Sequence, residues 1–103
     1  MFTAEEIKNT LSSRELIRVA PKVGTTKAGG VTIWGDRLIG ENVFYVVPQE
    51  AYYKFCGNAQ IAVFGKKNED YFEFKTASQA AKKGNQLLNE LNKKLSLIKI
   101  KIQ

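Results

Sequence analysis

The chain has 103 residues, of which 44% are hydrophobic, 11% aromatic and 25% charged, a composition typical of one globular domain. Thirteen lysines and three arginines outweigh ten acidic residues, and the formal net charge of +6 favours polyanionic partners. There is no histidine and one cysteine, Cys56. The composition therefore excludes an internal disulfide, a thiol–imidazole dyad and a structural zinc site, and we expect no cofactor and no metal.

The apolar stretches are too short to cross a membrane. The longest, residues 43–48 and 61–64, fall well below the roughly 20 residues that span a bilayer. Residues 1–6 carry two glutamates where a secretory signal would carry basic residues and then a long apolar segment. Together with the lone cysteine, which is typical of a reducing compartment, this predicts a cytoplasmic protein without a membrane partner.

The first predicted elements are a helix and a strand. Thr3 and Glu6 form a capping-box pattern, which predicts a helix over residues 4–11. Residues 16–20 read as a strand that a proline ends. Residues 22–30 are predicted to form a loop.

Two strands follow in the middle of the chain. Residues 31–34 alternate with period two, and Gly35 and Asp36 have the turn chemistry to end that strand before residues 38–39. Residues 43–47 are β-branched or aromatic throughout, without a polar face. This pattern predicts a central strand that is buried on both sides.

A short helix and a hairpin are predicted next. Residues 49–56 follow a proline and precede a glycine, which favours two turns of helix. Residues 61–64 and 71–75 flank a charged loop and read together as a β-hairpin.

The strongest helix signal begins with a second capping box at Thr76 and Gln79. We expect Gly84, inside this helix, to allow a close approach to the sheet. The helix is predicted from an apolar stripe with three-four spacing: Ala77, Ala80, Ala81, Gly84, Leu87, Leu88, Leu91 and Leu95.

Residues 96–103 alternate between isoleucines and lysines, which predicts a final strand with one dry face and one basic face. The predicted fold is a single α+β domain over residues 1–103, with a mostly antiparallel sheet of about five to six strands. The N-terminal helix and the long C-terminal helix pack on one face, and the last strand ends the chain. The expected shared core comprises Phe72, Phe74, Leu87, Leu88, Leu91, Ile98 and Ile100.

The first candidate site is the sheet face formed by the side chains that alternate with the core-facing residues of the strands. If Phe72 and Phe74 face the core, the alternate side chains form the opposite face of the sheet. A sheet face with basic and aromatic side chains stacks bases and follows phosphates in several modules that bind single strands. We expect this surface to contain Arg18, Trp34, Tyr71, Lys75, Lys99 and Lys101.

Two other interpretations of this pattern stay open. Trp34 and the tyrosines can form a second small core, while the lysines only solvate a face and its edges. Aromatic and basic residues together are also typical of anchors in protein–protein interfaces.

The second candidate is a row of lysines on the predicted long helix. Lys82 and Lys83 recur eleven positions later as Lys93 and Lys94, so all four fall on one side of the helix. Such a ridge attracts polyanions, although a charged outer face is also ordinary for a helix that packs on a sheet.

The third candidate is the triplet of Glu73, Phe74 and Lys75 on a predicted strand. It resembles the site of nucleases of the restriction-enzyme-like superfamily, in which the acid binds a divalent metal and the lysine positions the attacking water. Such sites need a second acid on a neighbouring strand, and the nearest candidate is Asp36. The triplet alone is a common coincidence.

These patterns predict a small basic binding protein without enzymatic activity, whose partner is nucleic acid held more through its backbone than through its bases. The alternative is a small inhibitor or adaptor of the kind that phages and mobile elements encode, which binds a protein partner. A metal-dependent nuclease ranks third. The sequence does not indicate an oligomeric state.

Overall fold

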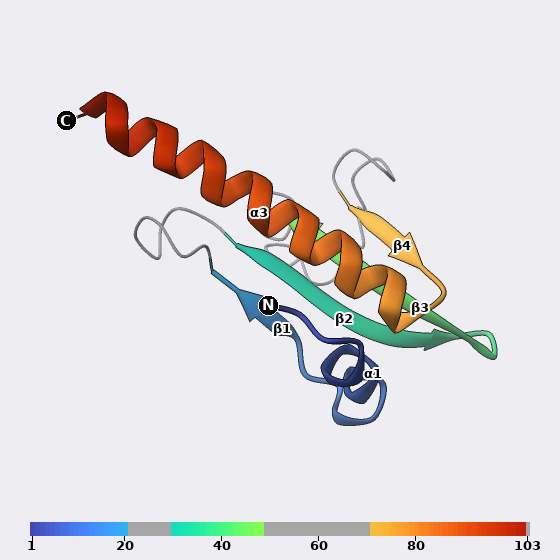
Figure 1. The fold of residues 1–103 in the computed structure, drawn as a ribbon. Helices are drawn as coiled ribbons and strands as arrows, with labels where there is room; N and C mark the ends of the chain where they lie inside the picture. Colours follow the sequence, from blue (N-terminus) through green and yellow to red (C-terminus); the bar gives the residue numbers. More distant parts are fainter. Residues whose placement is uncertain (21–29, 49–70, 103) are drawn as a thin grey trace, which may run out of the picture.

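A computed structural model describes residues 1–20, 30–48 and 71–102, and for residues 95–102 the main chain only. The chain forms an α+β fold, as predicted, with two helices packed on an antiparallel sheet (Figure 1). The elements are, in chain order, α1 (Ala4–Ser13), β1 (Ile17–Val19), β2 (Val31–Leu38), β3 (Glu41–Pro48), β4 (Phe72–Phe74) and α3 (Ala77–Ile102).

The described sheet has the strand order β1-β2-β3-β4, and each neighbouring pair is antiparallel. β3 lies between β2 and β4, and its Val46 and Val47 are fully buried. The prediction of a central strand buried on both sides is therefore confirmed. The sheet contains four strands within the described residues, where about five to six were predicted. One predicted strand, residues 61–64, lies outside the described residues, and the predicted final strand is part of α3.

α1 begins where its capping box predicted. The Thr3 hydroxyl accepts a hydrogen bond from the main-chain N–H of Glu6 at 3.2 Å, which satisfies one of the donors left open in the first turn. The helix continues to Ser13, two residues past the predicted end, and closes on Arg14 in the left-handed conformation. The main-chain N–H of Arg14 donates to the Thr10 carbonyl at 2.9 Å.

β2 differs from its prediction, because it runs through Gly35 and Asp36 instead of turning there. The N–H of Gly35 donates a hydrogen bond to the Thr10 hydroxyl at 2.7 Å. β1 pairs only with residues 31–33 of β2, so at Gly35 the hydrogen-bond partner comes from α1 instead. The turn lies at Ile39 and Gly40, whose φ angles of 50° and 79° are those of a tight hairpin loop.

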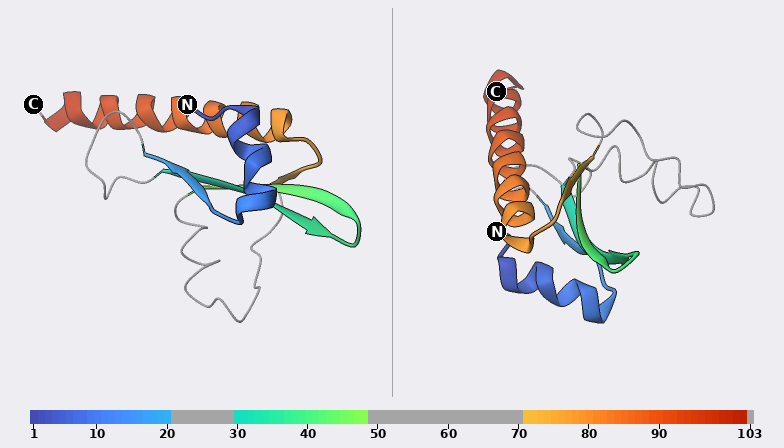
Figure 2. Two further views of the ribbon diagram at one scale, coloured as in Figure 1. Left: turned by 90° about the horizontal axis from the view of Figure 1, so that it is seen from below. Right: turned by 90° about the vertical axis from the view of Figure 1, so that its right-hand side faces the viewer.

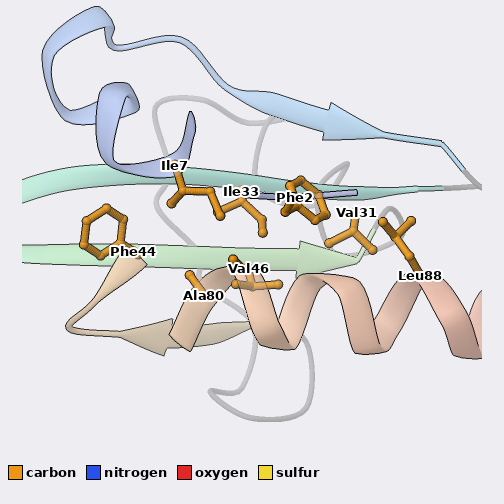
Figure 3. Close-up of a cluster of buried hydrophobic side chains, with 9 residues drawn as sticks. Phe2, Ile7, Val31, Ile33, Phe44, Val46, Ala80 and Leu88 are labelled. Carbon is orange, nitrogen blue, oxygen red and sulfur yellow. The ribbon is translucent and has the colours of Figure 1, made fainter. Parts of the chain in front are cut away.

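Both helices lie on the same face of the sheet (Figures 1 and 2). α1 packs against β2 and the first turns of α3, and α3 packs across β2, β3 and β4. Figure 3 shows side chains from the N-terminal segment, the strands and α3 converging between these layers. The buried members of this core are Phe2, Ile7, Val31, Ile33, Phe44, Val46, Ala80, Ala81 and Leu88.

The predicted core is confirmed in part. Leu88 is buried in it, and Phe72, Phe74 and Leu87 pack against it half-buried. Phe2 and Ile7, which the pattern did not single out, also belong to this core, because α1 and the residues before it pack against both β2 and α3.

Gly84 has the role predicted for it. A Cβ atom at this position would lie 2.5 Å from Cδ1 of Ile33 and 2.8 Å from the ring of Phe2. The missing side chain therefore lets α3 approach β2 and the N-terminal segment closely.

The predicted final strand is wrong, because α3 continues as a helix to Ile102. A helix satisfies its main-chain hydrogen bonds locally, and each residue added to a helix already formed costs little, whereas a strand needs a partner. Leu91, Leu95, Ile98 and Ile102 also continue the three-four spacing of the apolar stripe. The last turns extend beyond the strands of the sheet (Figures 1 and 2).

Several predictions concern residues outside the described ones. These are most of the loop at residues 22–30, the short helix at 49–56 with Cys56, and the first strand of the hairpin at 61–64. The second strand of that hairpin is β4, which pairs with β3. Among the described residues, neither helix has the length and apolar character to span a bilayer.

Candidate nucleic-acid interface

The side chains that alternate with the core residues of each strand lie on the face of the sheet opposite the helices. The register places Trp34 of β2 opposite Tyr45 of β3, and Tyr45 opposite Glu73 of β4. Arg18 of β1 pairs with Thr32, two residues before Trp34 on the same face. This surface, which we call the outer sheet face, comprises Arg18, Thr32, Trp34, Asp36, Val43, Tyr45, Val47, Tyr71 and Glu73.

Three aromatic rings lie in a row across this face. The rings of Trp34 and Tyr45 are stacked, with centroids 5.2 Å apart and planes inclined by 29°. Tyr45 and Tyr71 follow at 6.4 Å with a tilt of 47°. Tyr45 and Tyr71 are only 6% and 7% exposed and surround Val47, which is fully buried. The tyrosines thus form the second small core, and the half-buried Trp34 packs against it.

The buried position of Tyr45 has an electrostatic consequence. Burial raises the pKa of its hydroxyl above the ordinary value of 10.0, because the phenolate would lose hydration. The carboxylates of Glu73 and Asp36 raise this pKa further, since a second negative charge is unfavourable beside them. The centre of the outer sheet face is therefore a neutral aromatic cluster with acidic groups beside it.

The predicted basic residues do not gather on the outer sheet face. Arg18 is exposed there, on β1. Lys75 is exposed in the connection between β4 and α3, after the strand has ended. Lys99 and Lys101 belong to the last turns of α3, so the predicted alternation of a strand does not place them on the sheet.

The lysines are concentrated on α3 instead. This helix carries six lysines and one glutamate, a net charge of +5 out of the chain's +6. Lys82, Lys93 and Lys94 are exposed, while Ala80 and Leu88 of the same helix are buried against the sheet. Three of the four lysines predicted to form a row on this helix are therefore exposed. We call the row the lysine ridge: Lys82, Lys83, Lys93 and Lys94.

Lys83 contributes to the ridge in a different way from the other three. Its ammonium lies 4.4 Å from the centroid of the Phe72 ring, and the residue is half-buried. This cation–π contact ties the ridge to β4, the last strand in the order of the described sheet. Lys82, Lys93 and Lys94 have no ion-pair partner among the described residues, so their charges are available to a polyanion.

A hollow of about 430 Å³ opens beside Trp34, where β1 has ended and α1 flanks β2. The sequence pattern identified Trp34 but not Arg14, because only the packing of α1 brings Arg14 beside β2. Arg37 lies on β2 itself, and its side chain donates a hydrogen bond to Asn42 at 3.4 Å. The residues that line the hollow are Leu11, Arg14, Trp34, Gly35, Asp36 and Arg37.

The residues of the nuclease-like triplet separate in the fold. Glu73 lies on the outer sheet face, whereas Lys75 lies beyond the end of β4. Asp36, the candidate second acid, is two strands away, because β3 lies between β2 and β4. No group of three or more metal-ligating side chains occurs among the described residues.

No protein-family model, curated protein or solved structure matches this chain. The class of protein is therefore defined by its fold and its charge. It is a basic α+β protein in which a lysine-rich helix covers one face of an antiparallel sheet and an aromatic cluster occupies the other.

Proposed function

We propose that this protein binds nucleic acid without catalysing a reaction on it, and that the lysine ridge makes the main contacts to the phosphate backbone. The observation that carries the proposal is the charge of α3, which holds +5 of the chain's net +6 and exposes Lys82, Lys93 and Lys94. A polyanion binds most strongly where several such positive charges lie close together.

The spacing of the ridge suits a phosphate backbone. Eleven residues of helix separate Lys82 from Lys93 and correspond to a rise of about 16 Å. One strand of a duplex presents a phosphate about every 3.4 Å of helix axis, so the ridge spans about five of them. Lysines hold phosphate as point charges without reading bases, and we therefore expect affinity with little sequence preference.

Salt dependence tests the proposal. The binding of a fluorescein-labelled 20-mer is measured by anisotropy between 50 and 300 mM salt. Replacing Lys82, Lys93 and Lys94 together by alanine is expected to weaken binding to all sequences alike. The slope of log K against log salt should fall by about 0.7 to 0.9 for each phosphate that is no longer neutralised. Lys8→Ala, an exposed lysine of α1, is the control for removal of one charge elsewhere.

Two outcomes contradict this function. The first is a triple variant that binds with wild-type affinity and wild-type salt slope. The second is a wild-type protein that binds no nucleic acid at the lowest salt concentration.

One observation favours a second candidate function, that of an inhibitor or adaptor that binds a protein. Ile39 at the tip of the β2–β3 hairpin is completely exposed, and its neighbour Leu38 is 44% exposed. Ile39 also has a φ of 50°, which is unusual for a β-branched residue. An exposed apolar side chain on a strained tip, which projects beyond the start of α3 (Figure 2), is the form of an anchor for a partner's pocket.

Ile39→Asn separates the two functions. Asparagine tolerates the left-handed backbone and removes the apolar anchor, so the fold should be kept. Unchanged nucleic-acid binding by this variant is expected if the lysine ridge is the interface. A wild-type protein that fails to bind nucleic acid would leave the hairpin tip as the better candidate.

A further inference from the structure

We propose that the partner is duplex DNA and that α3 lies at a slant in its major groove. Lys82 then contacts phosphates of one strand, and Lys93 and Lys94 contact phosphates of the other. This inference rests on the proposed function and names its substrate class.

The positive charges of the lysine ridge form two groups. Lys82 and Lys83 make the first group, and Lys93 and Lys94 make the second, eleven residues later. Eleven residues are about three full turns of helix, so both groups point to the same side of α3. Residues 84–92 between them contain no lysine and include Glu90, the one acidic residue of this helix. The ridge therefore has two positive ends and a middle without positive charge.

The middle of the ridge is polar and exposed. Gln86, Asn89 and Glu90 are exposed and lie on the same side of α3 as the lysines. The side-chain nitrogen of Gln86 donates to a carboxylate oxygen of Glu90 at 3.5 Å. Asparagine and glutamine amides pair with the edge of adenine, and a carboxylate accepts from the amino group of cytosine. The groups between the lysines are thus those that contact base edges.

The position of Glu90 distinguishes two ways of placing phosphates on the ridge. A single strand of phosphates that follows the ridge from end to end would pass the Glu90 carboxylate, and the two negative charges would repel each other. A helix that lies between two strands places its middle over base edges and only its ends beside phosphates. The second arrangement satisfies all the charges. Because the lysine contacts still dominate, the sequence preference stays small.

The spacing of the two groups fits the major groove. Along the helix axis, Lys82 and Lys93 are about 16 Å apart. The major groove of B-form DNA is about 12 Å wide and admits an α-helix, whereas the minor groove is about 6 Å wide. The two ends of the ridge therefore reach the two backbones that border a major groove. The major groove of an RNA duplex is deep and narrow, so α3 would not enter it in the same way.

The fold leaves this side of α3 open to a groove. Ala80 and Leu88 are buried against the sheet, and the lysines lie on the opposite side of the helix. No described helix or strand lies over that outer side, and α1 lies beside α3 on the same face of the sheet (Figure 2). The helix therefore projects from the sheet as a single ridge.

The test compares three fluorescein-labelled duplexes of the same mixed sequence and length by anisotropy at one salt concentration. The first is ordinary DNA. In the second, glucosylated 5-hydroxymethylcytosine replaces every cytosine, which fills the major groove with neutral bulk and leaves the phosphates unchanged. The third is the RNA duplex. We expect ordinary DNA to bind about tenfold more tightly than either of the others, the effect of losing the contacts within the groove.

Two variants assign this preference to α3. Replacing Lys82, Lys93 and Lys94 together by alanine should bring the affinities for the three duplexes close to one another. Lys8→Ala, the exposed lysine of α1, should leave their ratio unchanged. All four side chains are exposed, so both variants should keep the unfolding midpoint of the wild type in urea.

The outcomes distinguish this inference from the proposed function. Salt-dependent binding with equal affinities for ordinary and glucosylated DNA would overturn the groove and leave the lysine ridge as a general phosphate-binding surface. RNA duplex bound as tightly as ordinary DNA would also overturn it. A preference for ordinary DNA that survives in the triple lysine variant would show that another element enters the groove. A protein that binds none of the three duplexes contradicts the proposed function itself.

Discussion

Asn85 of α3 holds the main chain of Phe2, which lies 83 positions earlier in the sequence. Its side-chain oxygen accepts from the N–H of Phe2 at 2.8 Å, and its side-chain nitrogen donates to the Phe2 carbonyl at 3.0 Å. The two bonds satisfy both main-chain polar groups of a residue that is 3% exposed. They attach the segment before α1 to the long helix, and the buried ring closes that end of the core.

Replacing Asn85 by alanine should destabilise the protein by about 1 to 3 kcal/mol, because both main-chain groups of Phe2 lose their partners in a partly buried place. The free energy of unfolding in urea measures this change. Asn89→Ala, an exposed asparagine one turn further along the same helix, is the matched control and should change stability by less than about 0.5 kcal/mol. Equal values for the two variants would contradict a structural role of the Asn85 side chain.

Gly84→Ala should destabilise the protein although alanine is the better helix former. The added Cβ would lie 2.5 Å from Cδ1 of Ile33, and we expect the displacement of packed side chains to outweigh a gain of about 1 kcal/mol in helix propensity. Chemical denaturation measures the net effect. An increase in stability would show that α3 shifts away from β2 without loss of packing.

The facing pair of Phe44 and Phe74 should respond unequally to truncation. Phe44 of β3 is 3% exposed, whereas its partner Phe74 on β4 is half-buried. Phe44→Ala should cost about 3 to 5 kcal/mol and Phe74→Ala about 2 kcal/mol, because the smaller loss of buried surface leaves a smaller cavity. Urea unfolding of both variants tests this order. A larger cost for Phe74→Ala would place the centre of the core at β4.

Stability should decrease in alkaline solution through Tyr45. Its pKa in the folded protein is raised, so the unfolded chain releases the proton first as the pH rises through 10. The contribution of Tyr45 is therefore complete below pH 10 and is lost as the pH approaches the pKa of the folded state. Tyr45→Phe, which keeps the ring but cannot ionise, should lose less stability than wild type between pH 8 and pH 11. Parallel curves for the two proteins in urea would exclude this linkage.

Incubation with plasmid or single-stranded DNA and Mg²⁺ or Mn²⁺ should produce no cleavage. Glu73 lies on β4, and its candidate second acid Asp36 lies two strands away on β2. Two carboxylates so placed do not hold one divalent ion, whose ligands lie within about 2.6 Å. Cleavage that Glu73→Ala abolishes would establish the nuclease interpretation instead.

Local patterns predicted the helix starts and the two faces of the sheet. Thr3 and Thr76 accept the capping hydrogen bonds that their sequence contexts predict, because a cap depends only on residues within one turn. Period-two alternation placed Phe72 and Phe74 toward the helices and Trp34 and Tyr71 away from them. Side-chain direction in a strand follows from the backbone, so it requires no knowledge of the partner strand.

The candidate site was only partly predictable, because local patterns do not show which elements pack side by side. Trp34 was identified from its place in the alternation of β2, but Arg14 lies near it only because α1 packs beside β2. Gly35 reads as a turn in sequence. In the fold, Leu11 and the ring of Phe44 occupy the space that its Cβ would need, both at 2.8 Å, and the strand continues.

The C-terminal segment shows most clearly what local sequence patterns cannot determine. Over residues 96–102 the alternation of isoleucine with other residues fits a strand, and the three-four spacing that continues from Leu91 fits a helix equally well. The composition and the capping box determined that a helix begins at Ala77, but not where it ends. The end depended on whether a neighbouring strand is available to pair with this segment. Hydrogen bonds within a helix are local, whereas those of a strand are made with another part of the chain, so only the assembled fold could distinguish the two.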